Sequence, residues 1–127
     1  MRPPLPARFT IFAVCTALAA CAHLDQPRNY LVYFDTDSAN LTPDGQRIVA
    51  TIASTAHDVS PSKILVAGRA DGSTAHDATL ADQRATVVMQ ALTQQGVAAN
   101  HIEKEPDAPP SNVTGVAAHE VVVTLLP

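Results

Sequence analysis

Two apolar runs with the composition of β-strands are each followed by a stretch in which apolar residues recur at helical spacing. The first run, Tyr30–Phe34, is aromatic and β-branched, and the second, Lys63–Ala67, is almost continuously apolar. A helix is expected to begin at Thr42-Pro43-Asp44, which supplies a capping hydroxyl, a proline and an acid near the positive end of the helix dipole. Because both kinds of element must bury an apolar face, the alternation predicts helices packed on a sheet.

The rest of the sequence extends this alternation. A second helix is expected to begin with Asp77 or Thr79 as its cap and to end at Gly96. Two further strands are expected, around His101–Glu103 and at Glu120–Leu126. The predicted fold is therefore an α+β two-layer sandwich of the order βαβαββ, and 127 residues suit one domain.

The beginning of the chain has a different character. Arg2 and Arg8 precede about a dozen mostly apolar, uncharged residues at 9–20. A basic start followed by such a run is typical of a secretory signal. The run is shorter than the roughly 20 residues that a membrane-spanning helix needs. We therefore expect residues 1–20 to be a signal that is removed on export.

The end of this segment, Leu18-Ala19-Ala20-Cys21, resembles the lipobox of bacterial lipoproteins. The resemblance implies a lipoprotein signal peptide at 1–20, lipid on the Cys21 thiol, a short lipidated tether at 21–29 and a domain at 30–127. Ala22, in place of an aspartate, implies an outer-membrane address with the domain in the periplasm. A plain signal peptide with a chance cysteine is the alternative. Cys15 would leave with the signal, so no disulfide is expected within the mature chain.

Charge and motif content exclude several classes of function. Removing residues 1–20 takes away two arginines and no acid, so the net charge changes from −4 to −6. An acidic domain argues against binding to a nucleic acid. No nucleophile elbow or phosphate-binding loop is present, and adjacent pairs such as His76-Asp77 do not build a metal site. We expect no enzyme, no metal and no cofactor.

The loop after the second strand and the helix that follows it carry the candidate chemistry. Gly68 and Gly72 allow tight turns around Asp71, and Arg84 lies on the same apolar helix stripe as Leu80. A buried arginine needs a partner, since an unpaired buried charge is costly. Asp71 and a ligand carboxylate both fit that role, and the sequence leaves the choice open.

This segment is similar to the signature of the OmpA-like peptidoglycan-binding domain, a family that includes peptidoglycan-associated lipoproteins. Gly68, Asp71, Leu80, Arg84 and Ala85 match the signature, and Tyr33-Phe34-Asp35 through Leu41-Thr42-Pro43 resembles the opening of the family. The resemblance covers 30–127 and implies helices packed on a mixed sheet.

The resemblance also implies a ligand, the meso-diaminopimelate residue in the stem peptide of peptidoglycan. Asp71 is the implied acceptor for the ligand ammonium and Arg84 the implied clamp for its carboxylate, with Leu80 beside it. Asp77 stands where the family has asparagine, and Asp35 where it has an acid near the pocket. The implied function is a non-covalent link between the outer membrane and the cell wall.

The chain also departs from the family pattern. Arg69-Ala70 replaces His-Thr, and Ala118-His119-Glu120 replaces Asn-Arg-Arg, which would place an acid near the pocket if Glu120 faces that way. From Cys21 to Tyr30 the chain reaches at most about 30 Å, which is short for a link from membrane to wall. The alternative function is therefore an OmpA-like scaffold that has lost peptidoglycan binding and acts as a protein-interaction module among envelope proteins.

Overall fold

The computed structural model describes residues 26–70, 75–105 and 119–127. Cys21, Asp71 and the predicted signal at 1–20 lie outside these residues, so the predictions made for them are untested by the structure. The order βαβαββ is confirmed. The elements are β1 (Arg28–Tyr33), α1 (Pro43–Val59), β2 (Lys63–Gly68), α2 (Ala75–Gln94), a 3-10 turn at Ala99–His101, β3 (Ile102–Lys104) and β4 (Glu120–Leu126).

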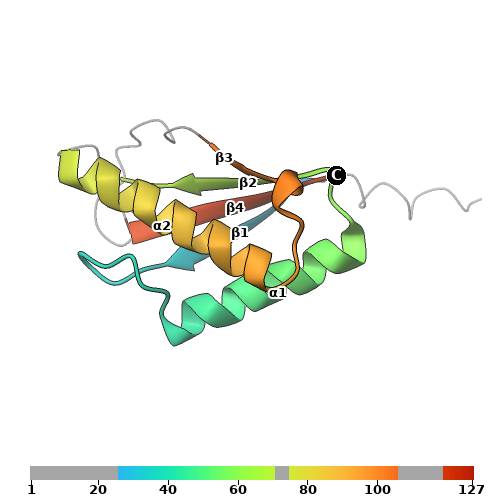
Figure 1. Ribbon diagram of the computed structural model, residues 1–127, viewed down its shortest axis with the longest axis horizontal. Helices are drawn as coiled ribbons and strands as arrows, with labels where there is room; N and C mark the ends of the chain where they lie inside the picture. Colours follow the sequence, from blue (N-terminus) through green and yellow to red (C-terminus); the bar gives the residue numbers. More distant parts are fainter. Residues whose placement is uncertain (1–25, 71–74, 106–118) are drawn as a thin grey trace, which may run out of the picture.

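The strands form a mixed sheet in the order β1-β4-β2-β3 (Figure 1). β4 pairs antiparallel with β1 on one side and with β2 on the other, while β2 and β3 are parallel. The carboxyl ends of β1 and β2 therefore lie at the same end of the sheet as the first residue of β4. This end is called the site end below, and the opposite end, where β1 begins, is called the tether end.

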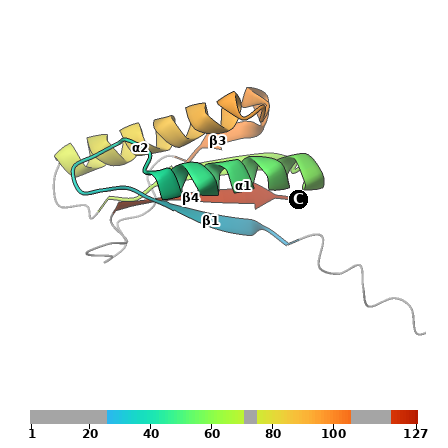
Figure 2. The same ribbon diagram turned by 90° about the horizontal axis from the view of Figure 1, so that it is seen from below.

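Both helices pack on one face of the sheet, as seen from the side in Figure 2. Successive side chains of a strand point to opposite faces, and the alternate residues that face the helices, such as Val32, Val66 and Val123, are buried. The other face carries partly exposed apolar side chains, including Leu31 and Tyr33. The largest fully buried side chains are those of Ile52, Ile64, Leu92, Val32, Val49, Val66, Val88, Val121 and Val123.

The start of α1 follows the sequence prediction. The Oγ1 of Thr42 accepts a hydrogen bond of 3.0 Å from the backbone N–H of Gly45, and Pro43 occupies the first turn. Ser60 ends the helix in the left-handed conformation, with φ of 48°. The hydroxyl of Thr42 thus pairs with a backbone N–H of the first turn that has no partner within the helix.

Some expected boundaries were wrong. α2 already includes Ala75, so neither Asp77 nor Thr79 is its cap; both lie inside the helix. β1 begins at Arg28 rather than Tyr30, because pairing with β4 extends to Arg28 opposite Leu125. The side chains of Thr124 and Asn29 add a hydrogen bond of 2.8 Å there. Gly96 follows the end of α2 as expected, with φ of 91°.

Gly68 fixes how closely α2 approaches the sheet at the site end. A Cβ on Gly68 would lie 2.1 Å from the backbone oxygen of Ala81. We expect Gly68→Ala to lower the free energy of unfolding by about 2–4 kcal/mol, since two backbones must separate. Urea denaturation measures this change. Gly45→Ala is the matched control, because its Cβ would meet only side-chain atoms, at 3.2 Å or more; equal effects of the two substitutions would contradict the prediction.

Candidate functional site

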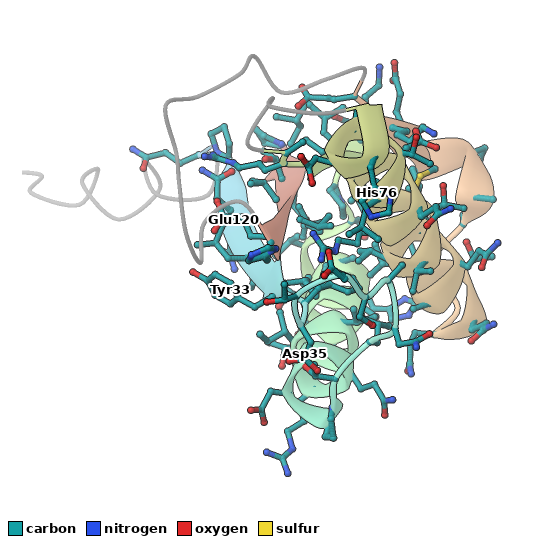
Figure 3. The ribbon with its side chains drawn as sticks, turned by 90° about the vertical axis from the view of Figure 1, so that its left-hand side faces the viewer. Tyr33, Asp35, His76 and Glu120 are labelled. Carbon is teal, nitrogen blue, oxygen red and sulfur yellow. The ribbon has the colours of Figure 1, made fainter. Side chains whose placement is uncertain are left out.

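Residues from four elements meet at the site end. Asp35 follows β1, Arg69 follows β2, Glu120 begins β4, and His76 lies in the first turn of α2. Figure 3 looks onto this end and shows Tyr33 and Glu120 on the sheet side, His76 on the α2 side, and Asp35 on the segment that leads to α1. The site is therefore formed where strand ends and a helix N-terminus converge.

Arg84 is buried at this end. Arg84 as a whole is only 2% exposed, and its guanidinium lies over the ring of Phe34, 5.5 Å from the ring centroid. The Nε donates a hydrogen bond of 2.7 Å to the backbone oxygen of Ser38, and an Nη donates one of 2.9 Å to the backbone oxygen of Asp35. The arginine thus joins α2 to the turn between β1 and α1.

The electrostatic surroundings of Arg84 act in opposite directions. Burial lowers the pKa of its guanidinium, whereas the nearby charges of Asp37 and Asp77 raise that pKa. An arginine side chain stays charged in proteins. The site therefore holds a buried positive charge whose hydrogen-bond partners in the turn are neutral carbonyl groups, with two acids close enough to affect it.

The predicted site residues have different outcomes. Arg84 is buried on the α2 stripe, as expected, with Leu80 buried one turn earlier. The side chain of Asp35 is exposed, and its backbone oxygen is what contacts Arg84. Asp77 is half-buried and within electrostatic reach of Arg84. Asp71 lies outside the described residues, so its pairing with Arg84 stays a prediction.

The sequence did not reveal an ion pair between Arg69 and Glu120. Nε of Arg69 lies 3.1 Å from Oε1 of Glu120, although this N–H is not aligned as a hydrogen bond. The two residues are also joined by a backbone hydrogen bond of 3.0 Å from Arg69 to Glu120. Glu120 is only 5% exposed, whereas 32% of the Arg69 side chain is exposed, so the acid is removed from water and the arginine only partly. Only the strand register, which places Gly68 opposite Val121, brings the two together.

This pair resolves what Glu120 does near the site. Glu120 is in register with Tyr33, and Tyr33 is exposed on the face away from the helices. Phe34, the next residue, is buried beneath Arg84. Glu120 thus lies on the other face of the sheet from Arg84 and has its own cation, so its charge is not aimed at the guanidinium.

Two other kinds of functional feature are absent from the described ranges. No group of three or more metal-ligating side chains occurs among them. None of the helices in the described part of the chain has the length and apolar character needed to cross a membrane.

The sequence profile of the OmpA family matches residues 33–115, which is more than half of the chain. No curated protein matches the sequence. Several solved structures are similar, although each is less than 25% identical to this chain, so the likeness concerns the fold.

One similar structure is the OmpA-like domain of FopA1 from Francisella tularensis, with 18% identity and a TM-score of 0.67; the match covers 78% of this chain and 71% of that one. The peptidoglycan-associated lipoprotein from Burkholderia pseudomallei has 24% identity and a TM-score of 0.57, with 76% and 87% covered. The cell wall anchor of the T6SS from Pseudomonas aeruginosa has 22% identity and a TM-score of 0.59, with 79% and 81% covered.

The burial of Arg84 predicts that it contributes to stability. We expect Arg84→Met to lower the free energy of unfolding by about 3 kcal/mol, because the substitution removes charge-assisted hydrogen bonds and leaves the carbonyl groups of the turn without donors. Urea denaturation measures the loss. Arg47→Met is the matched control, since the Arg47 side chain is 80% exposed; we expect a change below about 0.5 kcal/mol. Wild-type stability of Arg84→Met would contradict the prediction.

Proposed function

This chain belongs to the OmpA family, and on that premise we propose that it is an outer-membrane lipoprotein that binds peptidoglycan without a covalent bond. The ligand is the meso-diaminopimelate residue of the stem peptide. Lipid on Cys21 holds the domain at the membrane, and the site end holds the wall. The protein acts by binding and not by catalysis.

The observation that carries this proposal is the buried guanidinium of Arg84 at the site end. A guanidinium has five N–H donors, and the contacts with Asp35 and Ser38 use two of them. No other described residue accepts a hydrogen bond from this guanidinium, and its further donors suit a ligand carboxylate, which an arginine can hold through paired hydrogen bonds. Each such charge-assisted bond contributes about 1.5–3 kcal/mol.

The acids near Arg84 give the site negative charge, which suits a ligand ammonium. Asp37 and Asp77 both act electrostatically on Arg84, and Asp71 precedes α2 in the loop after β2. A free amino-acid end carries an ammonium beside its carboxylate, so it presents one charge to the arginine and one to an acid. We assign the ammonium to Asp71, with Asp77 contributing at longer range.

Access to Arg84 sets a condition on binding. Only 2% of the residue is exposed, so the atoms that cover the guanidinium must move aside before a carboxylate reaches it. The energy of that movement is subtracted from the affinity. A modest affinity is sufficient when the lipid anchor keeps the domain close to its ligand, because the effective concentration is high.

Two of the similar structures support the proposal. One is a peptidoglycan-associated lipoprotein, and the other is the cell wall anchor of the T6SS. The domain of this chain has their fold, and the signature residues Gly68, Leu80, Arg84 and Ala85 are in place.

We expect the mature protein to sediment with peptidoglycan sacculi and to be released by free meso-diaminopimelate. Arg84→Lys keeps the charge but loses the planar fork, and Asp71→Asn removes the acceptor charge. Each should weaken sedimentation by roughly tenfold or more, given the strength of one charge-assisted bond. Asp44→Asn is the control and should have no effect on sedimentation, because the Asp44 side chain is 84% exposed.

Circular dichroism of each variant separates loss of binding from loss of fold. If the wild type itself stays in the supernatant, peptidoglycan binding is wrong, and the scaffold function among envelope proteins takes its place. If Asp71→Asn and Arg84→Lys sediment as well as wild type, the ligand is held elsewhere.

The lipid anchor has its own test. Cells grown with labelled palmitate should incorporate the label into the wild type and into Cys15→Ser, but not into Cys21→Ser, because only Cys21 follows the lipobox. The Cys21→Ser protein should also leave the membrane fraction. Label in Cys21→Ser would show that the lipobox assignment is wrong.

A further inference from the structure

The cationic side chains of the mature chain are almost all engaged. Its six lysines and arginines all lie in the described ranges. Arg47, Lys63, Arg69 and Lys104 each form an ion pair, with Asp44, Glu103, Glu120 and Asp82 respectively. Arg84 is buried on its turn carbonyls. Arg28 has no ion pair with any residue that the structure describes.

Arg28 lies at the tether end, where it lines an open groove of about 390 Å³. The groove lies between the last residues of α1 and β4 and the first residue of β1, which meet at one end of the domain in Figure 1. Its other lining includes Val59, Pro61, Leu126 and Pro127, so most of it is apolar, and Val59 is 39% exposed. An exposed cation thus stands beside an exposed apolar surface.

The position of this groove along the chain indicates what it faces. Arg28 follows Cys21 by seven positions, which span at most about 25 Å when the chain is fully extended. A lipid on Cys21 would therefore keep the tether end within that distance of the membrane. The site end lies further away by the length of β1, about 20 Å for a six-residue strand.

We propose that the tether-end groove docks on the phospholipid surface that holds the anchor, with Arg28 contacting a headgroup phosphate and Val59 and Leu126 contacting the apolar boundary. This inference rests on the proposed lipid at Cys21. A single arginine near an anionic surface contributes attraction that is additive to the anchor. The mature domain is acidic overall, so this attraction is confined to the one end that carries an unpaired cation.

Asp58 opposes the docking, and its substitution provides a second test of the proposal. It lines the same groove but forms no ion pair with Arg28 in the described structure. Its charge repels an anionic surface, so removing that charge should strengthen docking, while removing the charge of Arg28 should weaken it. Docking in this pose directs the site end away from the membrane.

The absence of tryptophan from the chain allows a direct test. The described sheet, helices and core use only residues from Arg28 onward, so the mature chain from Cys21 keeps all of them. Its one cysteine, Cys21, is coupled to a maleimide lipid in vesicles that contain phosphatidylglycerol and brominated lipid. Val59→Trp reports on the groove, and Gln46→Trp, in the first turns of α1 at the site end, is the matched reporter.

We expect brominated lipid to quench the fluorescence of Val59→Trp and not that of Gln46→Trp. In the Val59→Trp background, Arg28→Gln should lower the ratio of docked to undocked protein about fivefold, and Asp58→Asn should raise it. Arg47→Gln, which removes the same charge at the site end, should leave it unchanged. Replacing the phosphatidylglycerol by phosphatidylcholine, with the brominated lipid kept, should reduce the quenching of Val59→Trp.

Equal quenching of the two reporters, or quenching that Arg28→Gln leaves unchanged, would overturn the proposal. The coupling supplies the anchor chemically and the assay contains no peptidoglycan. A failure here is therefore separate from a failure of lipidation in cells or of sedimentation with sacculi.

Discussion

The buried guanidinium of Arg84 holds the site end together. It takes a positive charge out of water and compensates for it with two turn carbonyl groups, the Phe34 ring and two acids at longer range. Burial of a charge is costly unless such contacts are present. The turn after β1 and helix α2 are consequently joined by the same residue that we assign to the ligand. The observed structural role and the proposed binding role therefore fall on one side chain.

The sheet separates the charges at this end. Arg84 lies on the helix face, whereas Arg69 and Glu120 lie at the ends of β2 and β4 with Tyr33 on the other face. Glu120 departs from the family pattern and would repel a ligand carboxylate if it faced the pocket. The structure gives Glu120 a cation of its own, so the two departures at Arg69 and Glu120 compensate for each other.

The sequence predicted the element order and the burial of Arg84, because apolar periodicity and turn residues are local signals. It also identified Thr42 as the cap of α1. It misplaced the start of α2, since Asp77 and Thr79 are good caps that the helix nevertheless includes. It missed the Arg69–Glu120 pair, because residues 51 positions apart meet only through strand register. The hydrogen bond from Arg84 to the backbone oxygen of Asp35 could not be predicted either. Every residue has a main-chain oxygen, and the sequence does not show which one lies beside the arginine.

The central place of β4 in the sheet has a consequence for the order in which the sheet can assemble. β4 follows every other described element along the chain, yet it lies between β1 and β2, which do not pair with each other. Until β4 has been synthesised, the sheet has no middle strand, and the antiparallel pairings with β1 and β2 cannot form. These non-local pairings, which are of the kind that slows folding, therefore become possible only after every other described element has been made.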